Sequence, residues 1–123
     1  MKTVRMGVLA MALSMTLATA WAVDEVPMVT GEQWVKSSVE LKKAYLIGIA
    51  NAFQVEAAYH ASKPPTDELS LIPRFGRGLK GHTLDTVREG LDQWYAAHPD
   101  HVTRPVIETI WFEMVVPGLQ KNK

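Results

Sequence analysis

Two histidines and an aspartate lie close together between two stretches of helical pattern, in the segment His98-Pro99-Asp100-His101. Imidazole nitrogens and carboxylate oxygens are ligands for zinc or copper, but a site needs three or four converging ligands and only two imidazoles are local. At a turn between helices, the same residue types also serve as caps and helix-end charges. We therefore predict no metal site. A metal-binding protein stays an alternative, which thermal stabilisation by zinc or copper would reveal.

Glu56 and His60 form a second candidate pair, one helical turn apart on an apolar stripe. A carboxylate in such a setting could act as a general acid or base. It has no identifiable catalytic partner, and buried carboxylates persist only when paired. We predict a satisfied polar group hydrogen-bonded to Tyr45, Tyr59 or a histidine. No serine has a nucleophile-elbow setting and no glycine pattern suits phosphate, so we predict a non-enzyme with no catalytic residue and no cofactor.

A basic, glycine-spaced segment from Arg74 to His82 suits recognition rather than catalysis. Arginine and an exposed aromatic on a flexible excursion are typical of protein interfaces, because these residue types dominate binding hot spots. The predicted partner-binding residues are Arg74, Phe75, Arg77, Lys80 and His82. The alternative is a solvated connector held in place by Phe75.

Capping residues and apolar periodicity predict the helices that position these groups. Thr30 has capping-box spacing to Gln33, which predicts a short opening helix. Residues 37–40 repeat this spacing ahead of the longest periodic stretch, residues 39–61. A glycine inside a helix costs about 1 kcal/mol relative to alanine. Gly48 therefore predicts either a neighbouring helix that approaches closely or a locally loose helix.

Two prolines, Pro64 and Pro65, end the long helix, and a connection of some twenty residues is expected from there to His82. A loop of that length in a small domain is usually functional or disordered. Thr83 is the expected N-cap of a third helix, which ends at His98.

Thr103 or Arg104 is expected to cap the last helix, with Pro105 in its first turn. The helix should end before Pro117, and residues 119–123 should form a frayed tail. No segment shows sustained alternation of period two. The predicted fold is all-α: a small bundle of about four helices with a long loop between the second and the third.

The first 22 residues have the features of a cleavable secretory signal peptide. Lys2 and Arg5 supply positive charge, an apolar run of about a dozen residues follows, and Ala20-Trp21-Ala22 gives a small-x-small cleavage pattern. The run is too short for a stable membrane-spanning helix, which needs ~20 apolar residues. We expect cleavage after Ala22, a single helical domain over residues 23–123, a periplasmic location and no stable membrane anchor.

Composition narrows the class of partner. The chain has 13 Lys and Arg against 13 Asp and Glu, and two of the basic residues leave with the signal, so residues 23–123 carry a formal charge of −2. Nucleic-acid binders gather Lys and Arg against phosphates, so we predict no nucleic-acid partner. Cysteine is absent. The stability of so small an exported domain must therefore come from helix packing, from oligomerisation such as a homodimer, or from both.

Three segments, in this order, carry a resemblance: Gly31 to Val35 as a short opening helix, Ala44 to Ala50 as the tyrosine-glycine centre of a long helix, and Thr83 to Val87 leading into Leu91, Tyr95 and His98-Pro99. With the helix up to Pro117, they resemble the exported Rap/Tai-type immunity family. The match spans most of residues 23–123 through motifs of low specificity, and it departs from the family in lacking cysteines. Members of that family are small periplasmic helical proteins that neutralise peptidoglycan amidase toxins delivered by type VI secretion.

The resemblance implies a non-enzymatic periplasmic protein that binds and occludes a protein partner, a cell-wall hydrolase. The segment from Arg74 to His82 would be one contact. The runner-up is a periplasmic stress or chaperone-like helical protein, which releases apolar surface when a dimer dissociates.

Overall fold

The computed structural model describes residues 26–63 and 70–122, so the predicted signal peptide lies outside the described residues. The described chain is all-α, as predicted from the sequence. Its elements are α1 (Gly31–Lys36), α2 (Val39–His60), α3 (Leu71–Gly78), α4 (Leu84–Ala97), a 3₁₀ turn (Pro99–His101), α5 (Val106–Ile110), a π-helical segment (Trp111–Val115) and α6 (Val116–Lys121).

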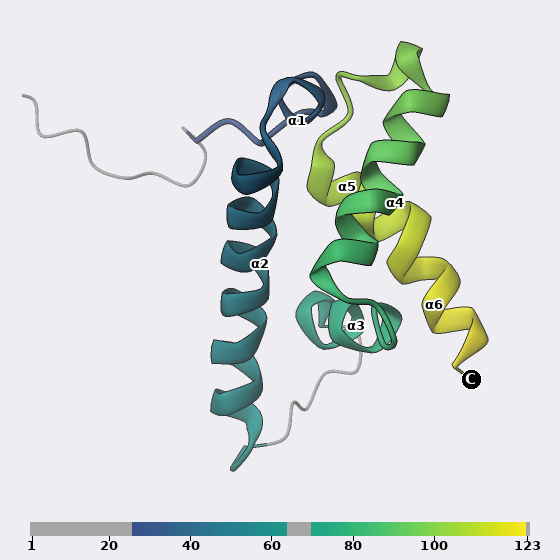
Figure 1. Cartoon of the computed structure of the whole chain (residues 1–123). Helices are drawn as coiled ribbons and strands as arrows, with labels where there is room; N and C mark the ends of the chain where they lie inside the picture. The colour runs from purple at the N-terminus through teal and green to yellow at the C-terminus, as the bar shows by residue number, and fades with distance from the viewer. Residues whose placement is uncertain (1–25, 64–69, 123) are drawn as a thin grey trace, which may run out of the picture.

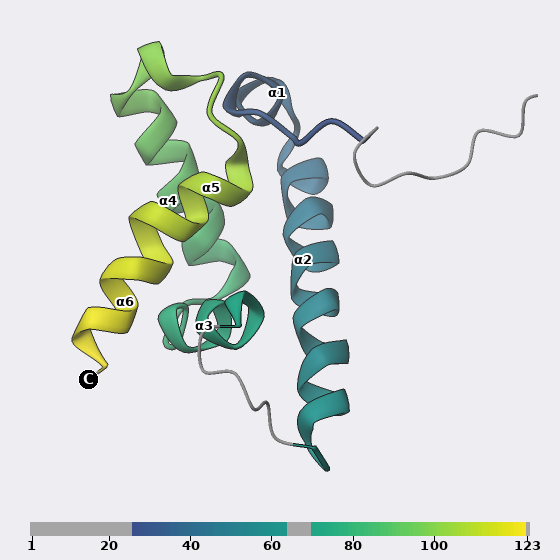
Figure 2. The ribbon, with the colours of Figure 1, turned by 180° about the vertical axis from the view of Figure 1, so that it is seen from behind.

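The helices form two groups that face each other (Figure 1). The long helix α2 runs along one side of the molecule. On the other side α4 lies against the continuous run of α5, the π-helical segment and α6, as the view from behind in Figure 2 also shows. Helix α3 contacts both α2 and α6, so it closes the end of the molecule at which α2 finishes.

The starts of α1, α2 and α4 follow the capping signals in the sequence. Thr30 and Gln33 form the predicted capping box of α1. At the start of α2, the Leu41 amide donates to the Ser38 hydroxyl at 3.2 Å. Thr83 caps α4, as predicted. These caps satisfy amide groups that have no partner within the helix, and each depends only on residues three positions apart.

The long loop expected before His82 is shorter than predicted, because Leu71–Gly78 forms α3. The Phe75 side chain drives this outcome. It is 3% exposed, and its ring lies 5.1 Å from the Phe53 ring and 5.0 Å from the Trp111 ring, centroid to centroid. Burial of an aromatic side chain of this size outweighs the weak helix preference of a segment that contains proline and glycine.

The C-terminal helix also differs from its prediction. Its N-cap position is Pro105, which makes no side-chain cap; instead the Val106 amide donates to the Val29 carbonyl at 2.8 Å. The helix does not end before Pro117 but continues to Lys121, without a frayed tail over the described residues. The wide π-helical segment precedes Pro117, which has no amide to donate to the preceding turn.

Two glycines allow close contacts between helices. A Cβ on Gly31 would collide with the Tyr95 ring, and a Cβ on Gly118 would collide with the Gly78 carbonyl. The first contact seats α1 against α4, and the second lets α6 cross α3. Around these crossings lies the core, whose most deeply buried side chains are Trp34, Leu91, Tyr95, Val106, Thr109, Ile110 and Val115.

Helix α2 contributes little to this core, because Leu46 is its only buried residue. The close approach expected at Gly48 does not occur among the described residues: none of their atoms lies within 4 Å of the position that a Cβ would take there. The alternative was a locally loose helix, and α2 runs as one continuous helix through Gly48. In the described part of the chain, no helix is long and apolar enough to cross a membrane.

Candidate functional site

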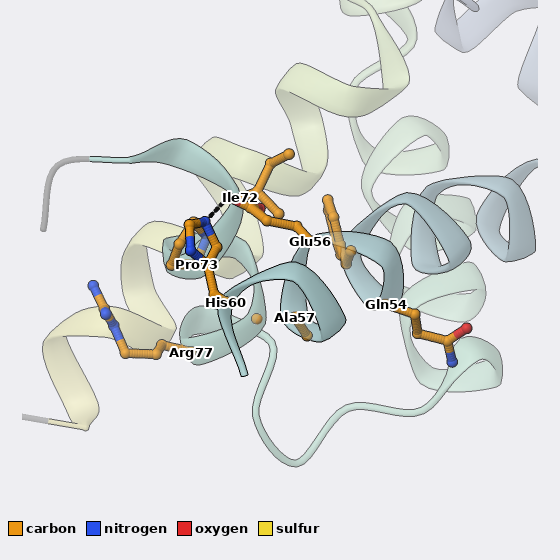
Figure 3. Close-up of a pocket in the computed structure, with 9 residues that line it drawn as sticks. Gln54, Glu56, Ala57, His60, Ile72, Pro73 and Arg77 are labelled. Atoms are coloured by element: carbon orange, nitrogen blue, oxygen red, sulfur yellow. Dashed lines mark ion pairs between the residues drawn. The ribbon is translucent and has the colours of Figure 1, made fainter. Parts of the chain in front are cut away.

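An apolar pocket of about 490 Å³ opens between the second half of α2 and α3. Phe53 and Ala57 line it from α2, and Ile72 and Pro73 line it from α3 (Figure 3). Arg77 stands at its edge. In the view of Figure 3 the Arg77 side chain extends outward on one side, and the Gln54 side chain extends outward on the other. The lining is therefore apolar inside and polar at the rim.

Helical spacing explains why these residues share one pocket. Phe53, Ala57 and His60 recur at intervals of four and three, so they lie on one face of α2. On α3, Arg77 follows Pro73 by four residues and lies above it on the same face. Pro73 is tolerated because it lies in the first turn of its helix, where its missing amide would have no intrahelical partner.

Glu56 and His60 form the only acid–base pair among the described residues that line the pocket. Glu56 Oε1 lies 3.3 Å from His60 Nε2 (Figure 3). The other ring nitrogen, Nδ1, lies 2.7 Å from the Lys63 carbonyl and must donate to it. The imidazole thus bridges the Glu56 carboxylate and the backbone carbonyl of Lys63, which follows the last turn of α2.

This contact agrees with the prediction that Glu56 pairs with a histidine, but the prediction that the group is satisfied holds for one of its two oxygens only. The second carboxylate oxygen, Oε2, is buried and has no hydrogen-bond partner. Because Oε2 is buried, this oxygen cannot take a proton from a substrate in the pocket, while Oε1 is already engaged with His60. The geometry therefore favours a structural role, in which the pair fixes the last turn of α2, over an acid–base role.

The five residues predicted to bind a partner do not form one surface. Phe75 lies in the core and is a correction to the prediction, because its apolar ring has more to gain from packing on Phe53 and Trp111 than from solvent exposure. Arg77 is exposed at the pocket edge. Arg74 is half-buried, and it lines neither the α2–α3 pocket nor the hollow beside α6 that is described below.

Lys80 and His82 line a different hollow, of about 410 Å³, between the α3–α4 turn and α6. Glu113 and Lys121 stand on its other side, so this hollow carries charges of both signs. His82 Nδ1 lies 3.2 Å from the Thr86 hydroxyl at the start of α4. The structure thus brings Lys80 and His82 together but separates them from Arg77.

Sequence reasoning missed the pocket because it missed α3. One signal was available: Ile72, Phe75 and Leu79 recur at intervals of three and four, which is a helical pattern. Pro73 and the glycines that surround Phe75 obscured it. The α2 side of the pocket was predicted correctly as a helix face, but nothing local indicated which segment would cover it.

The cluster of His98, Asp100 and His101 is engaged in packing and capping contacts. The His98 ring stacks on the Trp94 ring at 4.2 Å, and its Nδ1 donates to the Trp94 carbonyl at 2.7 Å. His101 Nδ1 lies 3.0 Å from Asp100 Oδ1, and this contact holds the pKa of Asp100 below its ordinary value. In the described ranges no three His, Cys, Asp or Glu side chains converge as metal ligands.

Comparisons of the chain with models of protein families, with curated proteins and with solved structures find no match. The resemblance to the Rap/Tai-type immunity family accordingly stays a prediction from the residues quoted above. The features of the structure that bear on function are the α2–α3 pocket and the surface around it.

Proposed function

We propose that this chain is a non-enzymatic binding protein that holds a protein partner at the α2–α3 pocket. The observation that carries the proposal is the pocket itself: an open apolar hollow of about 490 Å³ with the exposed Arg77 at its edge. Pockets that accept an anchor side chain from a partner have this character, an apolar interior with a few polar groups that fix orientation.

Charge indicates the character of the partner. Arg77 and Lys63 are exposed at this end of the molecule. Among the described residues that line the pocket, the one acidic group is Glu56, and it is already paired with His60. An apolar side chain in the pocket, with a carboxylate beside it for Arg77, is therefore the complementary surface that we assign to the partner.

The finer proposal is that the partner is an exported peptidoglycan hydrolase and that binding occludes its active site. Two features of the sequence support it: the secretory signal over residues 1–22 and the resemblance to immunity proteins against amidase toxins. In this proposal the chain inhibits the hydrolase by binding to it, and neither a catalytic step nor a cofactor is needed.

Two basic residues of the same segment provide a matched test. Arg77→Glu changes the pocket edge, whereas Lys80→Glu makes the same change of charge sign at the other hollow. Ala57→Trp fills the pocket without a change of charge. Residues 23–123 carrying each change would be used to capture partners from a periplasmic extract, and any captured hydrolase would be purified and assayed on peptidoglycan.

We expect Arg77→Glu and Ala57→Trp to abolish capture and inhibition, and Lys80→Glu to leave both intact. Equal loss in Arg77→Glu and Lys80→Glu would indicate a diffuse basic surface in place of the pocket. Full binding by Ala57→Trp would contradict the pocket as the docking site. Phe75→Ala is unsuitable as a probe, since removal of a buried phenylalanine costs about 3–5 kcal/mol of stability.

A second candidate function is favoured by a different observation. Leu41, Val55 and Tyr59 on α2 are all more than half exposed, and exposed apolar surface is what a chaperone-like protein offers to unfolded clients. Such a protein would bind a hydrophobic dye and suppress aggregation of a model client on acidification. A pocket-specific binder would do neither.

A further inference from the structure

A second apolar hollow, called the α2–α4 hollow below, lies between the middle of α2 and the start of α4 (Figure 1). Its volume is about 220 Å³. Three of the side chains that line it, Leu46, Val87 and Ile110, belong to the core and are 4%, 7% and 2% exposed. The other lining residues are Ile49, Ala50, Phe53, Leu79, His82, Thr83 and Leu84. The described lining therefore contains no carboxylate, and it is apolar except for a histidine and a threonine.

The hollow results from the way α2 lies against the rest of the chain. Leu46 is the only fully buried residue of α2. Ala50, one turn later, presents a methyl group at a place where a larger side chain would fill the space. On the α4 side, Leu84 is 41% exposed. Contact between apolar walls and water is unfavourable, so an apolar ligand that covers these walls would gain free energy on binding.

We propose that the α2–α4 hollow binds the hydrocarbon chain of a small anionic amphiphile, a straight-chain carboxylic acid of about eight carbon atoms. The length follows from the volume. An apolar cavity of about 150 Å³ accommodates benzene, which has six carbon atoms. In the same proportion, the 220 Å³ of this hollow accommodates about eight or nine.

The polar residues of the hollow indicate the head group. His82 and Thr83 are exposed, so they stand at its mouth. His82 Nδ1 lies 3.2 Å from the Thr86 hydroxyl, which orients the ring, and Nε2 forms no hydrogen bond with a described residue. The exposed Lys80 precedes His82 by two residues, whereas Asp85, the nearest acidic residue along the chain, lies 3.4 Å from Lys43 Nζ. The mouth thus offers donors and positive charge, which complement a carboxylate.

The α2–α4 hollow is separate from the α2–α3 pocket, although Phe53 lines both. The Phe53 ring packs on the Phe75 ring at 5.1 Å between centroids, so it stands between the two cavities. A carboxylic acid in the hollow would leave the pocket open to a protein partner. Its binding to the purified chain needs no partner, so this inference and the proposed function succeed or fail separately.

The first test varies the ligand. Residues 23–123 would be titrated calorimetrically with straight-chain carboxylates from butanoate to dodecanoate, each below the concentration at which it forms micelles. We expect the affinity to rise about fourfold for each added methylene and to stop rising at about eight carbon atoms, when the hollow is full. Octylamine has the same chain with the opposite charge and should bind about fivefold more weakly than octanoate.

Three outcomes of this titration would overturn the proposal. An absence of octanoate binding would show that the hollow is a packing gap only. An affinity that continues to rise through dodecanoate would indicate an open apolar surface in place of a hollow of limited size. Octylamine binding as tight as that of octanoate would exclude an anionic ligand.

The second test locates the site. In Ala50→Leu the new side chain would fill the hollow from α2, so the variant should be more stable than the parent and should bind octanoate at least about tenfold more weakly. Ala44→Leu makes the same substitution at an exposed position of α2 that does not line the hollow, and it should bind octanoate as the parent does. Unchanged affinity in Ala50→Leu, or equal losses in the two variants, would contradict the assigned site.

A direct measurement on the parent chain covers the case in which Ala50→Leu does not fold. With octanoate bound, the terminal methyl group of the ligand should give nuclear Overhauser effects to methyl groups of Val87 and Ile110, which line the hollow. The methylene next to the carboxylate should give them to the His82 ring. Effects to Ile72 and Pro73 instead would place the ligand in the α2–α3 pocket and overturn the proposal.

Discussion

The Tyr95 hydroxyl ties the C-terminal part of the chain to α4 at the level of single atoms. It donates to the Arg104 carbonyl at 2.8 Å and lies 2.9 Å from the Thr109 hydroxyl, which is itself 3.3 Å from the Pro105 carbonyl. The Tyr95 side chain is 2% exposed. One phenol group thus satisfies buried polar atoms on both sides of the turn that leads into α5.

Burial raises the pKa of Tyr95 above the ordinary tyrosine value of 10.0, although the Thr109 hydrogen bond and the nearby Arg104 charge act in the opposite direction. Burial likewise raises the pKa of Tyr45. The unfolded chain therefore loses these protons at lower pH than the folded chain does. The contribution of these groups to stability is complete below about pH 10 and is lost as the pH rises above it.

We predict that the free energy of unfolding falls between neutral pH and about pH 11, and that Tyr95→Phe makes this fall smaller. At neutral pH the same variant should be less stable by about 1–2 kcal/mol, because the Thr109 hydroxyl and the Arg104 carbonyl lose a buried partner. Urea denaturation at a series of pH values measures both effects. An unchanged alkaline slope in Tyr95→Phe would assign the titration to other groups.

Among the helices, Asp92 joins three elements. From α4 its Oδ1 accepts from the Trp34 indole of α1 at 2.8 Å and from Lys42 Nζ of α2 at 2.9 Å. Its Oδ2 lies 3.5 Å from the Arg88 guanidinium one turn earlier on α4. The Lys42 side chain is only 12% exposed, so this carboxylate is the main partner that its ammonium has in place of water.

We predict that Asp92→Ala lowers the free energy of unfolding by about 2–3 kcal/mol, since it leaves a mostly buried ammonium and an indole N–H without their acceptor. Asp85→Ala, on the same helix, is the control. Asp85 is 60% exposed and lies 3.4 Å from Lys43 Nζ. Loss of this exposed pair should cost under about 1 kcal/mol. Similar losses in the two variants, measured by chemical denaturation, would contradict the role assigned to Asp92.

For the molecule as a whole, the main feature is an uneven distribution of burial. Most of the buried core side chains come from α1, α3, α4, α5 and the π-helical segment, whereas α2 has one fully buried side chain, Leu46, with Tyr45, Ile49 and Phe53 partly buried against the core, and it exposes several large apolar side chains. Because the described chain has no cysteine, no disulfide contributes to its stability, which must come from packing within the chain or between chains. A homodimer, which the absence of cysteine suggests as one source of stability, would supply it by burying apolar surface that one chain leaves exposed.

A dimer stabilised in this way has a thermal midpoint that depends on concentration. We predict that the Tm of residues 23–123 rises with protein concentration, because dimerisation draws the equilibrium toward the folded state. Val55 is 71% exposed on α2, so if the dimer covers this surface Val55→Asp would place a charge in the interface, and its Tm should be lower and independent of concentration. Calorimetry over a wide concentration range measures both. A Tm of the parent chain that does not move with concentration would argue against a dimer.

The sequence by itself determined the starts of α1, α2 and α4 and the all-α class. Thr30, Ser38 and Thr83 act on amides three residues away, and the apolar periodicity of α2 and α4 depends only on neighbours along the chain. Information of this kind is local, so it survives without knowledge of the fold.

Tertiary structure decided which residues form the α2–α3 pocket, that Phe75 is buried, and that Asp92 joins α1, α2 and α4. Phe75 becomes a core residue only because Phe53 and Trp111, distant along the chain, arrive on its two sides. The same contacts turn the expected loop into α3 and leave Arg77 at the edge of a pocket. Burial depends on which surfaces meet, and the free energy of that meeting outweighs local preferences for turn or helix.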